Sequence, residues 1–157
     1  QPGEENAAGA RAMVDAGIPH RPGILALLQW LQERRVPRAV ATSTRNPLAS
    51  HKLRQAGLLP YFPVVCTASD VAHPKPAPDV YLLAASRLGV EPARCLVLED
   101  SPAGVRAALA AGMTPIQVPD LVAPDAATRA LGHRIAASLE QVLPLLQAVF
   151  DPVAAAD

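Results

Sequence analysis

Two places in the sequence put charged side chains directly after apolar runs, where charge has no role in packing. Lys75 stands between two prolines, and Glu99 and Asp100 follow the apolar run 95–98. Adjacent carboxylates at the end of a buried strand repel each other unless a cation or a proton joins them, and their oxygens suit Mg²⁺. The flanking prolines stiffen the lysine loop and so direct its ammonium group. These residue types predict phosphate chemistry with a bound metal ion.

Each of these groups also has a simpler interpretation. Lys75 could be an exposed loop lysine, as most lysines are. Asp100 or Ser101 could cap the following helix, where a negative charge meets the positive end of the helix dipole. Capping explains one carboxylate but leaves the second without a role, so a cation site stays the preferred hypothesis.

A third polar group follows the apolar run 38–41. Its hydroxyls, together with the N–H groups that open the next helix, could hold phosphate oxygens. Taken alone, the group is better explained as a helix cap with ordinary turn hydroxyls. The group comprises Thr42, Ser43, Thr44, Arg45 and Asn46.

Composition limits the classes of protein to which this chain can belong. Half of the 157 residues are apolar, and 14 Lys and Arg balance 14 Asp and Glu. The charges form no block of one sign, which argues against a nucleic-acid or membrane partner and leaves a small polar or anionic ligand. No run approaches the roughly 18 apolar residues of a membrane helix. Cys66 and Cys95 fit buried reduced thiols, so we expect a cytoplasmic protein.

Strand-type and helix-type patterns alternate along the chain, which predicts a parallel sheet with helices on both faces. The expected fold is α/β, a three-layer Rossmann-like arrangement. We expect strands at 38–42, 62–66, 95–98 and 114–118, and a short fifth at 134–137. Helices are expected at 21–35, 46–57, 78–88 and 101–112, and from Ser138 onward.

Three motifs together give a resemblance to a known family. They are Ala39-Val-Ala-Thr42-Ser43, His73-Pro-Lys75-Pro-Ala-Pro-Asp79 and Leu98-Glu99-Asp100-Ser101-Pro-Ala-Gly104. In order and spacing they resemble the haloacid dehalogenase-like (HAD) hydrolase superfamily, in its phosphatase and β-phosphoglucomutase-like branch. The resemblance covers about residues 21–120 and is more specific than any single motif.

The resemblance implies a role for each motif residue. Thr42 would hydrogen-bond the transferring phosphoryl group with Ser43 nearby, and Lys75 would neutralise its charge and steady the nucleophile. Asp100 would help to bind Mg²⁺. Glu99 would be a second metal ligand or would orient one through water. Arg45 and Asn46 match the family pattern less directly, and the resemblance implies that they would contact the substrate or its phosphate.

The family's nucleophile has no counterpart in the sequence. Family members begin with a strand that ends in Asp-x-Asp, whose first Asp attacks phosphorus and whose second acts as acid and base. No Asp-x-Asp occurs here, and neither Asp15 nor Asp151 has the required neighbour. We therefore expect the chain as given to be inactive. We also expect its sheet to lack the central first strand, leaving a gap beside Val40 and Val97 or filling it with another segment or chain.

These arguments lead to a hypothesis for organisation and function. Because the chain begins at Gln1 rather than Met, we expect further residues upstream. Residues 1–20 would be a remnant of a helical cap and linker, with the cap's last helix at 4–18, and 151–157 a tail; between them, 21–150 would be the HAD-like core. The function would be Mg²⁺-dependent hydrolysis of a small phosphorylated metabolite through an aspartyl-phosphate. The alternatives are a phosphosugar mutase and a phosphate-binding or interaction module without catalysis.

Overall fold

A six-stranded parallel sheet forms the centre of the molecule. The computed structural model describes residues 9–16, 21–120 and 123–150. The strands follow the spatial order β3-β2-β1-β4-β5-β6, and every neighbouring pair is parallel. Their bounds are β1 Ala12–Asp15, β2 Arg38–Ala41, β3 Val64–Cys66, β4 Cys95–Glu99, β5 Thr114–Gln117 and β6 Arg134–Ile135.

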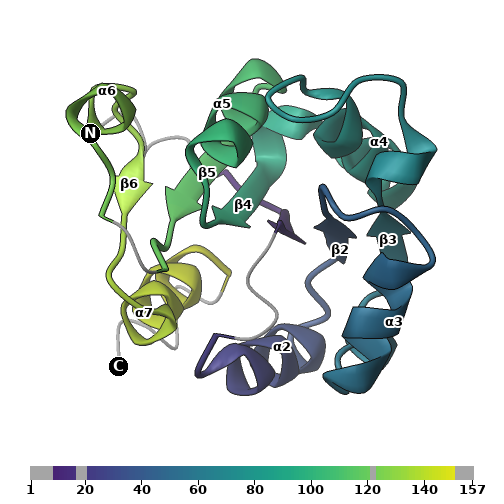
Figure 1. Cartoon of the computed structure of the whole chain (residues 1–157). Helices are drawn as coiled ribbons and strands as arrows, with labels where there is room; N and C mark the ends of the chain where they lie inside the picture. The colour runs from purple at the N-terminus through teal and green to yellow at the C-terminus, as the bar shows by residue number, and fades with distance from the viewer. Residues whose placement is uncertain (1–8, 17–20, 121–122, 151–157) are drawn as a thin grey trace.

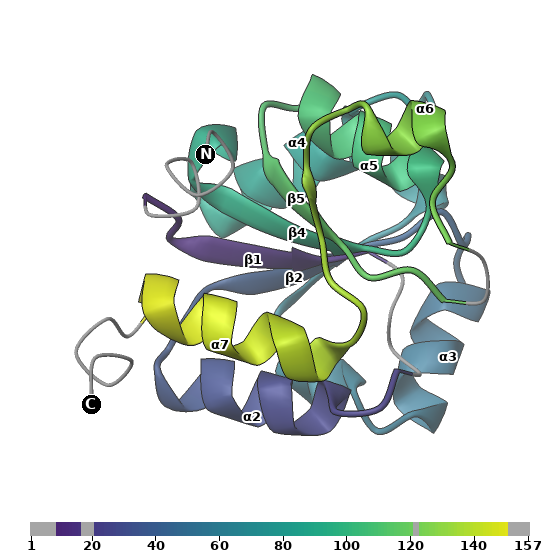
Figure 2. The ribbon, with the colours of Figure 1, turned by 90° about the vertical axis from the view of Figure 1, so that its left-hand side faces the viewer.

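Helices cover both faces of this sheet and bury a separate apolar cluster on each (Figures 1 and 2). Helices α2 and α7 lie side by side on one face, and α4 and α5 lie on the other. The helix bounds are α2 Ile24–Glu33, α3 Leu48–Gln55, α4 Asp79–Leu88, α5 Pro102–Ala110, α6 Ala126–Arg129 and α7 Leu139–Phe150. Short 3₁₀ turns occupy Leu59–Tyr61, Pro92–Arg94 and Ala68–Asp70.

The expected α/β class and layer arrangement are confirmed, and local sequence explains most element boundaries. Helix α5 begins where Ser101 Oγ accepts a hydrogen bond from Gly104 N at 3.1 Å. Helix α4 ends at Gly89, whose φ of 70° is a conformation that favours glycine. Helix α3 starts two residues later than Asn46, but the Asn46 side chain still caps it by accepting from Ser50 N at 3.1 Å.

The expectation of a sheet without its central strand is wrong. Strand β1 lies between β2 and β4, with Asp15 opposite Val40 and Val14 opposite Val97. Another segment of the same chain thus fills the expected gap. Within the described residues, the helix expected over 4–18 is replaced by this strand, which joins the sheet of the 21–150 core.

A physical reason for the difference is the cost of an open groove through the sheet. Each buried N–H or C=O left unmet costs about 1–3 kcal/mol, and β1 meets those of both neighbouring strands. That gain outweighs the helix propensity of Ala12 and Met13, because strand preference depends mostly on tertiary context. Asp151 and the expected tail at 151–157 lie outside the described residues.

Two further expectations concern the cysteines and membrane segments. Cys66 and Cys95 are free and buried, which confirms the expected thiols. In the described parts of the chain, no helix has the length and apolar character needed to cross a membrane.

The position of β1 can be tested by truncating its core-facing side chain. Met13 is fully buried among residues of α2 and α7. We expect Met13→Ala to lower the free energy of unfolding by about 2–5 kcal/mol, through lost burial and a residual cavity. The control is Leu25→Ala on α2. Because Leu25 is 47% exposed, this variant should change the free energy of unfolding by less than about 0.5 kcal/mol. Equal effects of both variants in urea titrations would contradict the placement of β1.

Candidate active site

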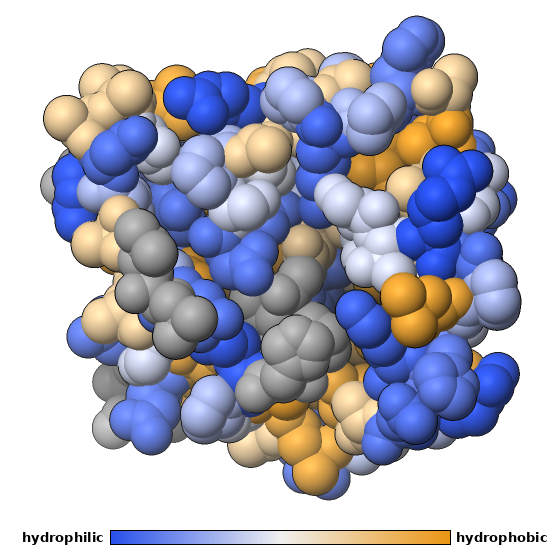
Figure 3. Space-filling view, viewed as in Figure 1, coloured by the Kyte–Doolittle hydropathy of each residue, from blue (hydrophilic) through white to orange (hydrophobic). Residues whose placement is uncertain are grey.

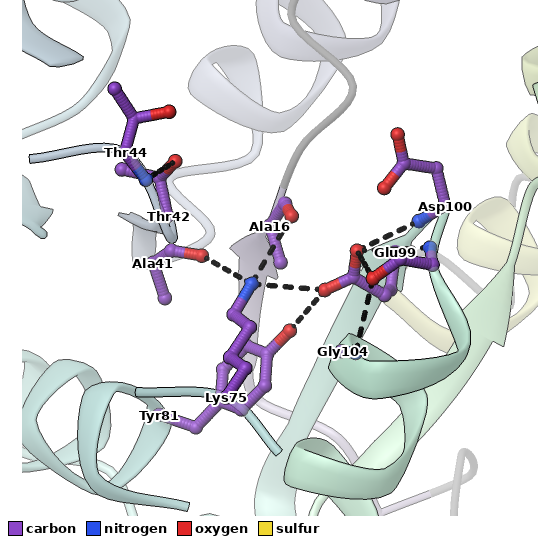
Figure 4. A network of polar contacts seen from close by, with 10 residues as sticks. Ala16, Ala41, Thr42, Thr44, Lys75, Tyr81, Glu99, Asp100 and Gly104 are labelled. Carbon is purple, nitrogen blue, oxygen red and sulfur yellow. Dashed lines mark hydrogen bonds and ion pairs between the residues drawn. The ribbon is translucent and has the colours of Figure 1, made fainter. Parts of the chain in front are cut away.

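A buried ion pair lies where the carboxyl ends of the central strands meet (Figure 4). Lys75 Nζ is 3.0 Å from Glu99 Oε2, and the two side chains are only 5% and 1% exposed. Lys75 comes from the loop before α4, and Glu99 is the last residue of β4. The two motifs therefore meet in space, as the sequence predicts.

Lys75 also joins strands that are distant in sequence. Its ammonium group donates to the carbonyl of Ala41 at 3.1 Å and to that of Ala16 at 3.4 Å, in addition to Glu99. Ala41 ends β2 and Ala16 follows β1 directly. One ammonium group thus links the carboxyl ends of β1, β2 and β4, and its three N–H groups each have an acceptor.

Donors surround both oxygens of Glu99. Oε1 accepts from the backbone N–H groups of Asp100 and Ser101 at 3.0 and 3.2 Å, and from the Ser101 hydroxyl at 3.2 Å. Oε2 accepts from Lys75 and, at 2.5 Å, from the hydroxyl of Tyr81. Gly104 completes this cradle, because a Cβ at its position would overlap the Glu99 carboxylate.

The charges of this network follow from its burial and its partners. Burial alone would raise the pKa of Glu99, but the Lys75 charge and the donated hydrogen bonds hold it below its usual value. Burial and the neighbouring Glu99 charge together raise the pKa of Tyr81 far above its usual value. Glu99 is therefore a carboxylate that accepts, and Tyr81 is a neutral hydroxyl that donates.

Asp100 is the more accessible of the two adjacent carboxyl groups. Burial and the hydrogen bond and charge of Glu99 raise the pKa of Asp100 to about 7. A carboxyl group that resists ionisation beside a second negative charge favours a nearby cation. Among the described residues, no cluster of three or more His, Cys, Asp or Glu side chains is placed to hold a metal ion. A Mg²⁺ ion here would complete its shell with waters and substrate oxygens, as Mg²⁺ commonly does.

The hydroxyl-bearing loop begins at the end of β2. Thr42 N donates to the carbonyl of Cys66 at 3.0 Å, and Thr42 Oγ1 accepts from Thr44 N at 3.1 Å. The Thr42 hydroxyl hydrogen can still donate to a ligand.

This loop and α3 border a hollow of about 780 Å³. That volume is ample for a small metabolite. The face seen in Figure 3 is mainly hydrophilic around α3, at its lower right. The hollow is lined by Thr44, Arg45, Asn46, Pro47, Leu48, Ser50, His51 and Arg54.

The structure brings the predicted site residues to one end of the sheet, with differences in detail. Thr42, Lys75, Glu99 and Asp100 follow or end neighbouring strands, while Arg45 and Asn46 border the hollow and Ser43 is exposed beside it. Both oxygens of Glu99 are occupied by protein donors, which points to an anchoring role for that residue. The roles assigned from the resemblance remain predictions.

Two members of the network were not assigned a role from the sequence. Tyr81 has the spacing of an apolar core residue in α4, and nothing in that pattern signals its hydroxyl. Gly104 does carry a signal, because a glycine in the first turn of a helix lowers helix stability and so calls for a packing reason. Its contact with Glu99 supplies that reason.

Comparison with known proteins agrees with this geometry. The family model described as haloacid dehalogenase-like hydrolase matches residues 5–112, which is more than half of the chain. The chain belongs to this family.

Relatives of this HAD-like chain include phosphatases. It is 39% identical over 114 residues to the fructose-1-phosphate phosphatase YqaB of Escherichia coli, covering 73% of this chain and 60% of that protein. A HAD family hydrolase from Deinococcus radiodurans, solved with bound phosphate and sodium, is 36% identical with a TM-score of 0.74, covering 82% and 59% of the two chains. A candidate β-phosphoglucomutase from Thermotoga maritima gives a TM-score of 0.75 at 34% identity, covering 82% and 60%. The HAD-like chain thus spans at most about three fifths of the length of these relatives.

The close contact between Gly104 and Glu99 gives a first prediction. Alanine normally stabilises a helix by about 0.5–1 kcal/mol relative to glycine. We expect Gly104→Ala to do the reverse and lower the free energy of unfolding by about 1–3 kcal/mol, because the added methyl group overlaps a carboxylate that several hydrogen bonds hold in place. Gly9→Ala is the control, since a Cβ there meets open space. A stabilised Gly104→Ala protein would contradict the packing described here.

The raised pKa of Asp100 gives a second prediction. Its folded pKa of about 7 exceeds the ordinary value of 3.8, so the folded state holds a proton more tightly than the unfolded state. This contribution to stability is complete below about pH 4 and is lost as the pH rises through 7. We expect wild type to lose about 1 kcal/mol more than Asp100→Asn between pH 5 and pH 8, a figure reduced for the exposure of the group. Parallel pH profiles of the two proteins in urea titrations would refute this assignment.

Proposed function

We propose that this HAD-like chain carries the phosphate-binding and Mg²⁺-binding part of a phosphomonoester hydrolase for a small phosphorylated metabolite. The observation that supports it best is the convergence of Thr42, Lys75 and Asp100 at the ends of β2 and β4 and beside the end of β1. A hydroxyl donor, an ammonium group and a carboxylate beside a cation site are the groups that phosphoryl transfer requires.

Each residue has a separate task in this proposal. The Thr42 hydroxyl donates to a phosphoryl oxygen, and Lys75 offsets the negative charge that the phosphate brings. Asp100 holds Mg²⁺, which when bound would supply charge neutralisation at the phosphoryl oxygens. Glu99 keeps Lys75 at the strand ends through the buried ion pair.

The attacking carboxylate is the remaining requirement. We propose that it belongs to an Asp-x-Asp strand of the whole protein, since the chain contains no such sequence and spans about 60% of YqaB. Its oxygen would bond to phosphorus as the ester oxygen leaves, and water would then release phosphate from the aspartyl-phosphate. Asp15 ends β1, but it has Gly17 rather than a second Asp two residues later, so we assign it no part in the reaction.

The hollow beside α3 accommodates the rest of the substrate in this proposal. Arg45 and the Asn46 amide N–H₂ group face a metabolite with hydroxyl or anionic groups, which the sugar phosphate named for YqaB also has. Hydrolysis is preferred to mutase chemistry because that curated relative is a phosphatase. We keep the cytoplasm as the proposed location because both thiols are free.

The test is the hydrolysis of p-nitrophenyl phosphate with Mg²⁺ by the full-length protein and by the 157-residue chain. We expect activity only in the full-length protein. There, Lys75→Ala and Asp100→Asn should each reduce kcat at least about 100-fold, because each removes charge stabilisation in the transition state. Asp15→Asn should leave kcat within about twofold, since Asp15 has no proposed part in the reaction.

Three outcomes would contradict the proposal. Unchanged kcat in Lys75→Ala and Asp100→Asn would show that neither residue has the role assigned to it. Activity of the 157-residue chain that Asp15→Asn abolishes would make Asp15 the nucleophile. Phosphoryl transfer to a second sugar position, with no free phosphate released from sugar phosphates, would favour the mutase alternative.

A further inference from the structure

The hydroxyl of Tyr81 has a position that packing alone does not explain. Tyr81 is fully buried in α4, and its hydroxyl donates to Glu99 Oε2 at 2.5 Å. Its ring also lies beneath the Lys75 ammonium group, with Nζ 4.9 Å from the ring centroid. One side chain therefore contacts both members of the buried ion pair (Figure 4).

The acceptors of Lys75 define a problem that Tyr81 can solve. The three N–H groups of Lys75 are directed to Ala16 O, Ala41 O and Glu99 Oε2. To contact a phosphate oxygen, Lys75 must weaken at least one of these bonds. If it turns away from Glu99, the carboxylate would lose a donor in a buried position, which is costly for a charged group.

Tyr81 supplies a second donor to the same oxygen. Because Oε2 would keep the Tyr81 hydrogen bond, Glu99 stays partnered while Lys75 shifts toward an anion. The Glu99 Oε1 atom is held separately by the Asp100 and Ser101 N–H groups, so the carboxylate itself does not move.

We infer that Tyr81 is a positioning residue of the phosphate site, whose hydroxyl holds Glu99 so that Lys75 can exchange a protein acceptor for a phosphate oxygen. This inference rests on the proposed function, since it requires Lys75 to bind phosphate. A tyrosine that only filled the core would be replaceable by phenylalanine without an effect on anion binding.

The first experiment measures the affinity of the 157-residue chain for inorganic phosphate by calorimetry in the presence of Mg²⁺. We expect Tyr81→Phe to weaken the affinity about tenfold, because it removes the hydroxyl and keeps the ring. Tyr61→Phe is the matched control, since Tyr61 is the other tyrosine and its hydroxyl accepts a long 3.4 Å hydrogen bond from Gln29 Nε2. The control should stay within twofold of wild type.

A second measurement does not depend on the folding of Tyr81→Phe. In the Tyr61→Phe background, 3-fluorotyrosine labels position 81 alone, and its ¹⁹F resonance reports on the hydrogen bond to Glu99. Phosphate should shift this resonance in a saturable way, and Lys75→Met should abolish the shift.

The outcomes distinguish a failure of the role inferred for Tyr81 from a failure of the proposed function. Phosphate binding with an unmoved ¹⁹F resonance, or with equal affinity in folded Tyr81→Phe, would overturn the role of Tyr81 and leave the proposed function standing. A wild-type chain that binds no phosphate would overturn both.

Discussion

The buried ion pair between Lys75 and Glu99 is the constraint on which the site depends. Two charges that are almost wholly removed from water require compensation from each other and from further hydrogen bonds. Such a pair contributes little net stability, because desolvation offsets most of the attraction. The pair therefore constrains the geometry of the site, since the two side chains can separate only where each charge keeps or gains another partner.

Several otherwise unrelated features follow from this constraint. The small residue at Gly104 leaves room for the Glu99 carboxylate, and the first turn of α5 supplies its donors. The lysine loop reaches across the sheet, so that the ammonium group meets the carbonyls of Ala16 and Ala41. Asp100 is partly buried beside this fixed negative charge, and burial together with Glu99 raises its pKa. The chemistry proposed for the site is therefore a consequence of how the pair is buried.

Sequence reasoning predicted the parts of this structure that depend on local pattern. Apolar runs followed by polar residues located the ends of β2 and β4, and Ser101 marked the start of α5 because a hydroxyl cap satisfies a free N–H group. The α/β class followed from the alternation of those patterns. The resemblance implied that Lys75 and Glu99 belong to one site, but it did not imply the ion pair between them.

The remaining features depend on tertiary contacts that no local pattern encodes. Strand β1 forms although Ala12 and Met13 favour a helix, because its central position between two strands satisfies the backbone groups of both neighbours. The donor to Glu99 from Tyr81 depends on how α4 lies against the sheet. The occupation of both Glu99 oxygens by protein donors likewise appears only when the fold is assembled, and the role of Glu99 toward a metal ion stays a prediction.

A double-mutant cycle of Lys75→Met, Glu99→Gln and their combination tests the central claim most directly, with the free energy of unfolding as the readout. We expect each single variant to lose about 3–5 kcal/mol, because each leaves one member of a buried pair without its partner. The double variant should lose much less than the sum, with a coupling free energy of at least about 2 kcal/mol. Losses that add to within about 0.5 kcal/mol would show that the two side chains act independently and would contradict the account.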